Sequence, residues 1–114
     1  MGAHEPNPLR EARAGLITLS MVIGATVPSA LNATRAGHGS ALQDARRRAF
    51  NARVRRGELF DRYADIDAAL TDPVTGRLRR GFNGDSTLGE PGDGVHPNRA
   101  GHAAIARCVF ACLA

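Results

Sequence analysis

Lysine and tryptophan are absent from this chain of 114 residues, and its aromatic side chains are one tyrosine and four phenylalanines. All fifteen basic residues are therefore arginines, which outnumber eleven acidic residues and give a net charge of +4. Positive charge attracts nucleic acid, but single-strand binding also uses aromatic rings on which bases stack. Because such rings are scarce, we interpret the arginines as a compositional bias and do not expect nucleic acid as a partner.

The chain also lacks an apolar run of about 18 residues, the length that a membrane-spanning helix requires. The apolar stretch at residues 16–25 is interrupted by Thr18 and Ser20. It has neither the charged start nor the cleavage pattern of a signal peptide. We interpret it as a parallel strand covered on both faces, and we leave the compartment open.

Cysteine is rare, with Cys108 and Cys112 as the two examples. Side chains four residues apart share one face of a helix, but a disulfide between them would strain that helix. Two thiols without nearby histidine or cysteine partners also make a poor zinc site. We therefore predict that both are small core residues.

Hydrophobic periodicity and turn residues predict an alternation of helices and strands. Ser40 and Gln43 have the spacing of a capping box, and the helix after them is expected to run to about Arg56 and to stop at Gly57. The expected elements are a lead-in at 1–8, the end of a helix at 9–14, a strand at 16–25, a loop at 28–39, a helix at 40–56, a strand at 60–67, a turn at 71–76, a glycine-rich loop at 81–94 and a helix at 98–113.

Both long helices carry apolar residues at a spacing that predicts a buried face. The predicted apolar stripe of the first helix consists of Leu42, Ala45, Ala49, Phe50 and Val54. The predicted core face of the last helix consists of Gly101, Ile105, Cys108, Val109 and Cys112.

The first long helix also holds a crowd of basic residues: Arg46, Arg47, Arg48, Arg53, Arg55 and Arg56. Such a cluster could bind nucleic acid, or it could be a solvated helix face whose last-turn arginines complement the helix dipole. We expect the solvated face.

The segment from Asp93 to Asn98 carries the strongest chemical signal. A carboxylate three residues before a histidine can turn back and accept the hydrogen on Nδ1 of His96, which leaves Nε2 free as a general base. Pro97 restricts His96 to extended backbone angles, and Asn98 can cap the following helix. Asp93 and His96 are therefore the candidate catalytic residues, two members of a hydrolytic triad.

The motif Asp-x-x-His-Pro-Asn at residues 93–98 resembles the last sequence block of the SGNH (GDSL-type) ester hydrolases. Three other segments are similar to that family, in the family's order. Residues 21–28 resemble a strand with its Thr-x-Pro loop, residues 47–55 an arginine-rich helix, and residues 60–73 the next strand and its exit turn. The resemblance covers about residues 9–106. It implies an α/β fold, namely the C-terminal half of a three-layer, flavodoxin-like sheet with flanking helices.

The resemblance implies hydrolysis of a small acyl ester, of carbohydrate or lipid, without cofactor or metal. In the family the nucleophilic serine lies in a Gly-Asp-Ser block after the first strand, and the oxyanion donors lie in the next two blocks. All of these precede the region that this chain resembles. We therefore expect negligible turnover by the isolated chain and a need for the N-terminal half of the domain. Family members are often secreted.

Two other readings of the site involve further residues. The sequence of the nucleophile block also occurs at Gly84, Asp85 and Ser86. No buried strand precedes these residues, so we expect a loop there. A metal site built from Asp93, His96 and His102 matches no ligand-spacing motif, and we expect none.

We divide the chain into a lead-in at residues 1–15 and a partial SGNH-hydrolase-like domain at residues 16–114. Half of a doubly wound sheet would expose apolar strand edges and faces. The leading hypothesis is an ester hydrolase that carries acid and base without the serine. The alternative is a catalytically inactive remnant or an arginine-rich interaction module.

Overall fold

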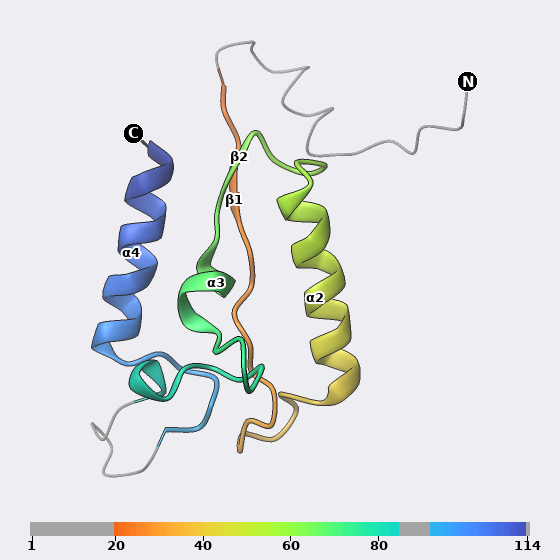
Figure 1. Cartoon of the computed structure of the whole chain (residues 1–114), viewed down its shortest axis with the longest axis vertical. Coiled ribbons are helices and arrows are strands. Elements are labelled where there is room, and N and C mark those ends of the chain that lie inside the picture. Colours follow the sequence, from red (N-terminus) through yellow and green to blue (C-terminus); the bar gives the residue numbers. More distant parts are fainter. Residues whose placement is uncertain (1–19, 85–91, 114) are drawn as a thin grey trace.

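The computed structural model describes residues 20–84 and 92–113, which form a small α/β domain around a parallel pair of strands (Figure 1). Strand β1 spans Ile23–Ala25 and strand β2 spans Arg62–Ala64. The strands are parallel, and Gly24 lies opposite Tyr63. A side chain at Gly24 would overlap the ring of Phe60, with its Cβ only 2.0 Å from Cδ2, so glycine makes room for that ring.

Helix α2, Ala41–Arg55, connects the two strands, as a parallel pair requires. Its start confirms the predicted capping box: the N–H of Gln43 donates to Oγ of Ser40 at 3.1 Å, and Oε1 of Gln43 accepts the N–H of Ser40 at 3.3 Å. The helix ends just before Gly57, whose φ of +74° is easy for glycine alone.

After β2 the structure departs from the expected strand at residues 60–67. Asp65 instead begins a short helix, α3, which spans Ile66–Leu70. Oδ1 of Asp65 accepts the N–H of Ala68, which caps the helix. The strand prediction is therefore wrong from Asp65 onward, because a capping carboxylate sits where the strand was expected to continue.

The predicted turn at 71–76 is present, with a bridge between Thr71 and Leu78 closing it. A 3₁₀ turn, η1, follows at Arg80–Phe82, within the stretch expected as a glycine-rich loop. The last helix, α4, spans Arg99–Leu113 and confirms the predicted C-terminal helix. The predicted lead-in and helix end at residues 1–15, and residues 85–91 of that glycine-rich loop, lie outside the described residues.

The apolar core lies between α3, the 71–78 turn and α4. Leu70 is fully buried, and Leu78 and Ala104 are each 6% exposed. On α4 the predicted core face is mostly confirmed, since Gly101 is buried and Ile105, Cys108 and Cys112 are partly buried. Val109 is the exception: it is 39% exposed, because it lies beyond the edge of the face that meets α3 and β2.

The inner face of α2 is polar, and the apolar stripe predicted there is wrong. Leu42 is 60% exposed and Phe50 38% exposed, and Ala45 and Ala49 also face solvent; only Val54 of that stripe is buried. Asn51 is fully buried in its place. The face that meets β1 and α3 is polar because loop backbone groups and carboxylates lie there and require hydrogen-bond partners.

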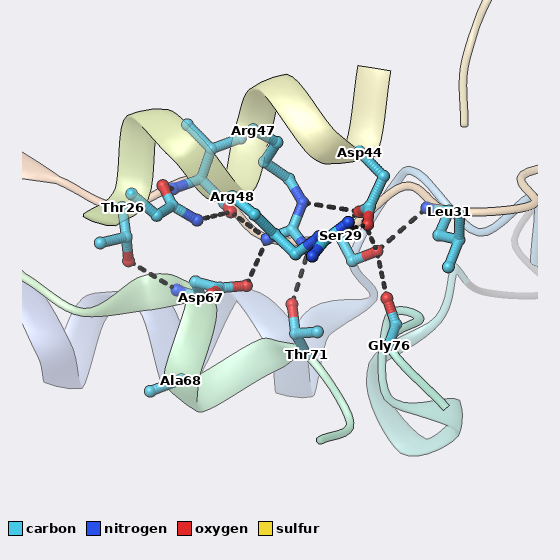
Figure 2. Close-up of polar contacts among 12 residues, drawn as sticks. Thr26, Ser29, Leu31, Asp44, Arg47, Arg48, Asp67, Ala68, Thr71 and Gly76 are labelled. Carbon is cyan, nitrogen blue, oxygen red and sulfur yellow. Dashed lines mark hydrogen bonds and ion pairs between the residues drawn. The ribbon is translucent and has the colours of Figure 1, made fainter. Parts of the chain in front are cut away.

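Figure 2 shows this polar layer between α2, the loop after β1, and α3. Arg47 lies at its centre and contacts Asp44 on its own helix at 2.9 Å and Asp67 of α3 at 2.6 Å. The hydroxyl of Thr26 donates to Asp65 at 2.7 Å and accepts the N–H of Asp67 at 2.9 Å. No buried side-chain nitrogen or oxygen among the described residues lacks a partner. The layer is a complete network, as buried polar groups require.

Several large apolar side chains remain at the surface of the described residues. Phe110 and Leu113 on α4 are 71% and 61% exposed, and Met21 and Val27 beside β1 are 53% and 46% exposed. Every helix in residues 20–84 and 92–113 lacks the length and apolar character that a membrane span requires.

Candidate active site

Asp93 and His96 contact each other directly. Nδ1 of His96 lies 2.6 Å from Oδ2 of Asp93, as the three-residue spacing predicts. A carboxylate can only accept a hydrogen bond, so the hydrogen of this contact sits on Nδ1. In the neutral imidazole, Nε2 then carries the lone pair. The pair therefore has the orientation of an acid that steadies a general base.

The other oxygen of the same carboxylate is bound by the loop itself. Oδ1 of Asp93 accepts the N–H of Val95 at 2.8 Å and the N–H of His96 at 2.9 Å. These backbone hydrogen bonds, followed by the one from the His96 ring, lower the pKa of Asp93 well below its usual range. Asp93 is therefore ionised at any pH at which the protein would work, and it stays an acceptor for the ring.

The ring of His96 is open to solvent. The side chain of His96 is 64% exposed, whereas that of Asp93 is 26% exposed. Among the described residues, Asp93 is the partner of the ring, through Nδ1, and no bond to Nε2 is formed. A substrate or a hydroxyl group from elsewhere can reach it.

Helix α4 starts immediately after the pair and fixes one end of its loop. Oδ1 of Asn98 accepts the N–H of Gly101 at 2.9 Å, which confirms the predicted cap. The side-chain amide of Asn98 also donates to the carbonyl of Gly81 at 2.9 Å. Gly101 packs so closely that an added Cβ would lie 2.7 Å from Cβ of Pro97. The loop, the helix and η1 are thus one packed unit.

The pair lies at the end of the domain where both strands finish, as Figure 1 shows for the segment that precedes α4. The loop after β1 reaches it there, because the N–H of Thr34 donates to the carbonyl of Asp93 at 2.9 Å. A cavity of about 180 Å³ lies on this side of Asp93, and Asn32, Thr34, Arg77 and Asn83 contribute to its wall. The carboxyl ends of parallel strands are where α/β folds gather reactive groups.

Sequence reasoning did not identify Thr34 or Asn83, which both bond the Asp93–His96 loop. Thr34 lies 59 residues before Asp93, and only folding brings the two together. Neither spacing nor composition carries a signal for such a contact.

Two serines in the described part of the chain, Ser29 and Ser40, have hydroxyls that are engaged away from His96. The hydroxyl of Ser29 donates to the carbonyl of Gly76 at 2.6 Å and accepts the N–H of Leu31 at 3.0 Å. The hydroxyl of Ser40 caps α2. Ser86, the alternative nucleophile, lies outside the described residues.

In residues 20–84 and 92–113, no three side chains of His, Cys, Asp or Glu gather as a metal site. His102 is exposed on α4 and does not join Asp93 and His96. Cys108 and Cys112 are free thiols, and Sγ of Cys112 donates to the carbonyl of Tyr63 at 3.0 Å.

The arginine cluster of α2 is largely engaged in ion pairs. Five of its six arginines contact an aspartate or glutamate of the chain: Arg47, Arg48, Arg53, Arg55 and Arg56. Arg48, Arg53 and Arg56 are more than half exposed, so these pairs lie at the surface of the helix.

Comparison of the chain with protein-family models and with curated proteins found no match.

Proposed function

We propose that this chain is the acid–base portion of an SGNH-type ester hydrolase and that its fold is the C-terminal half of that family's three-layer, flavodoxin-like sheet. The observation that carries the proposal is the 2.6 Å contact between Oδ2 of Asp93 and Nδ1 of an exposed His96. Supporting features are the parallel β1–α2–β2 unit and the position of the pair at the carboxyl ends of its strands.

In this proposal Nε2 of His96 removes the proton of a serine hydroxyl as its oxygen attacks the ester carbonyl. Asp93 stabilises the imidazolium that forms. His96 then donates that proton to the departing alcohol oxygen, and the acyl group remains on the serine. Water, deprotonated by the same Nε2, attacks the acyl-serine and releases the acid, and the serine recovers its proton.

The serine and the oxyanion donors belong, in this proposal, to an N-terminal half that completes the domain. Oxyanion stabilisation and the nucleophile are the large contributions to the rate of such a reaction. The substrate is a small acyl ester of carbohydrate or lipid. The described residues alone therefore act only as an imidazole held in the right tautomer, and we expect negligible enzymatic turnover from them.

Hydrolysis of p-nitrophenyl acetate by the purified 114-residue chain tests the proposal, with free imidazole at equal concentration as the reference. We expect a slow rate on the order of that of imidazole, because imidazole attacks activated esters unaided. His96→Ala should lower that rate, and Asp93→Asn should reduce it as well. His102→Ala, which changes another exposed histidine, is the matched control and should lower the rate less than His96→Ala does, because Asp93 pairs with the ring of His96.

Two results would contradict the proposal in different ways. A rate that His96→Ala does not change would remove the catalytic role of the pair. Rapid turnover that both His96→Ala and Ser86→Ala abolish would show that the chain supplies its own nucleophile, contrary to the missing-half account.

A further inference from the structure

Three contacts from outside hold the turn from Asp93 to His96. The carbonyl of Asp93 accepts the N–H of Thr34 at 2.9 Å, and the carbonyl of His96 accepts the N–H of Gly84 at 2.6 Å. Between them, the N–H of Gly94 donates to Oδ1 of Asn83 at 2.8 Å. The first two bonds join backbone to backbone, so no side-chain substitution removes them.

The third bond depends on one side chain. Asn83 is well placed to hold it, because its backbone pairs with Pro97 in an antiparallel bridge and its N–H donates to the carbonyl of Arg80 at 3.4 Å. The other outside side chain at the turn, the hydroxyl of Thr34, lies 3.4 Å from the carbonyl of Asp93, which the N–H of Thr34 already serves. Asn83 is thus the stronger side-chain contact.

Two glycines make this contact possible. Gly94, whose N–H donates to Asn83, has a φ of +82°, a conformation that residues other than glycine rarely adopt. Gly92 lies against the carboxamide: an added Cβ would be 2.5 Å from Oδ1 of Asn83. A side chain at residue 92 would therefore displace the group that holds Gly94.

The geometry points to Asn83 as a positioning residue for the Asp93–His96 pair: its carboxamide oxygen holds Gly94 so that the carboxylate of Asp93 faces Nδ1 of His96. Asn83 touches neither reacting atom and acts through the turn. A role of Asn83 in catalysis rests on the proposed function. Its effect on the Asp93–His96 contact can be measured without any turnover.

The test is nitrogen NMR of the histidine rings in the full chain at pH 8, where an ordinary imidazole is neutral. It reports which ring nitrogen of His96 carries the hydrogen. We expect the Nδ1–H form to dominate, and Asn83→Ala to reduce the ratio of Nδ1–H to Nε2–H about fivefold, the effect of losing one ordinary hydrogen bond. Asn83→Asp keeps an acceptor oxygen at the same place and should retain the ratio. Asp93→Asn is the reference variant: it shows the ratio of Nδ1–H to Nε2–H that is expected when the carboxylate no longer pairs with His96.

A second pair of variants covers the case in which Asn83→Ala unfolds the chain. Gly92→Ala places a Cβ against both the carboxamide and the backbone carbonyl of Asn83 without removing either group, and it should lower the same ratio. Gly81→Ala is its control, since an added Cβ there meets nothing within 4 Å and its backbone has no positive φ. An unchanged ratio in folded Asn83→Ala, or in Gly92→Ala, would overturn the inference. A failure of the proposed function can be distinguished from a failure of this inference, because it would appear as ester hydrolysis that His96→Ala does not affect.

Discussion

Helices α2 and α4 are each fifteen residues long and flank the strand pair (Figure 1), but different forces attach them. Helix α4 packs through small and apolar residues onto Leu70 and Leu78. Helix α2 is attached through Arg47 and Asn51, which bond the loop after β1 and the carboxylate of Asp67. Burial of apolar area holds one side of the domain, and a closed polar network holds the other.

The difference shows what a hydrophobic pattern can and cannot indicate. An apolar face needs only apolar neighbours, so its spacing in the sequence predicts its burial. A polar face can be buried only if each group meets a specific partner, and those partners come from distant parts of the chain. Two of the four exposed residues of the α2 stripe are alanines, which bury little area, whereas Asn51 satisfies two backbone groups of Val27.

Substitution in the apolar core should have the largest effect. Leu70→Ala removes a fully buried side chain, and we expect it to lower the free energy of unfolding by about 2–5 kcal/mol. Leu113→Ala, at a residue that is 61% exposed, should have a much smaller effect. Urea denaturation measures both. Equal losses would show that the core is not where the structure places it.

Substitution of the buried asparagine on the polar side should lower the free energy of unfolding by a smaller amount. Asn51→Ala leaves the N–H of Val27 without its partner and should cost about 1–3 kcal/mol, the penalty for an unsatisfied buried group. Phe50→Ala, one residue away on the outer face, should cost less. If Phe50→Ala proved the more damaging in urea denaturation, α2 would pack through its apolar stripe after all.

The two sides should also differ in their response to acid. Bonds from Arg55 lower the pKa of Asp65; burial works to raise the pKa of Asp67, but hydrogen bonds from Thr71 and Arg55 and the ion pair with Arg47 lower it overall. Both folded pKa values thus lie below the unfolded values near 3.8. Their stabilisation is complete above that pH and is lost as the pH falls through the folded pKa values.

We expect this loss to be about 1 kcal/mol or less, because Arg55 and Asp65 are each about one-third exposed and solvent screens them. Unfolding measured at pH 7 and at successively lower pH below 4 checks it. Arg55→Met should flatten the decline, whereas Leu70→Ala should shift the whole curve without changing its slope. If the free energy of unfolding of Arg55→Met fell as steeply with pH as that of the unchanged protein, other groups would be responsible for the acid sensitivity.

The smallest effect should come from the outer stripe of α2. Leu42→Ala changes a side chain that is 60% exposed, so thermal or urea unfolding should shift by no more than about 0.5 kcal/mol. Ser40→Ala, two residues earlier, removes the cap and should cost about 1 kcal/mol, which shows that the assay can detect a change in this helix. A larger loss at Leu42 than at Ser40 would mean that something covers the stripe.

Local chemistry explains which features the sequence predicts. Ser40 with Gln43, Asn98 with Gly101, and Asp93 with His96 are all pairs three residues apart, and each makes the expected contact. Such contacts depend on a few backbone angles, so residue type and spacing are enough. The start of α3 at Asp65 is equally local, but the strand-like pattern around it concealed the cap.

Contacts between distant segments could not be predicted in the same way. The bond from Thr34 to Asp93 and the ion pairs of Arg47 and Arg55 with Asp65 and Asp67 depend on how the strands and helices are arranged. The spacing of Asp44 and Arg47 is local, but only the fold shows that Asp67 also pairs with Arg47. The same limit explains Asn83, whose partner Gly94 lies eleven residues away across a loop.

The central claim is that Asp93 holds His96 with Nε2 exposed as a base. Its most direct measurement is the rate at which diethyl pyrocarbonate modifies each histidine at pH 8, read by mass spectrometry of the peptides. His102, exposed on α4, is the internal control. The account predicts that Asp93→Asn slows the modification of His96 and leaves that of His102 unchanged. A His96 rate that Asp93→Asn does not alter would contradict it.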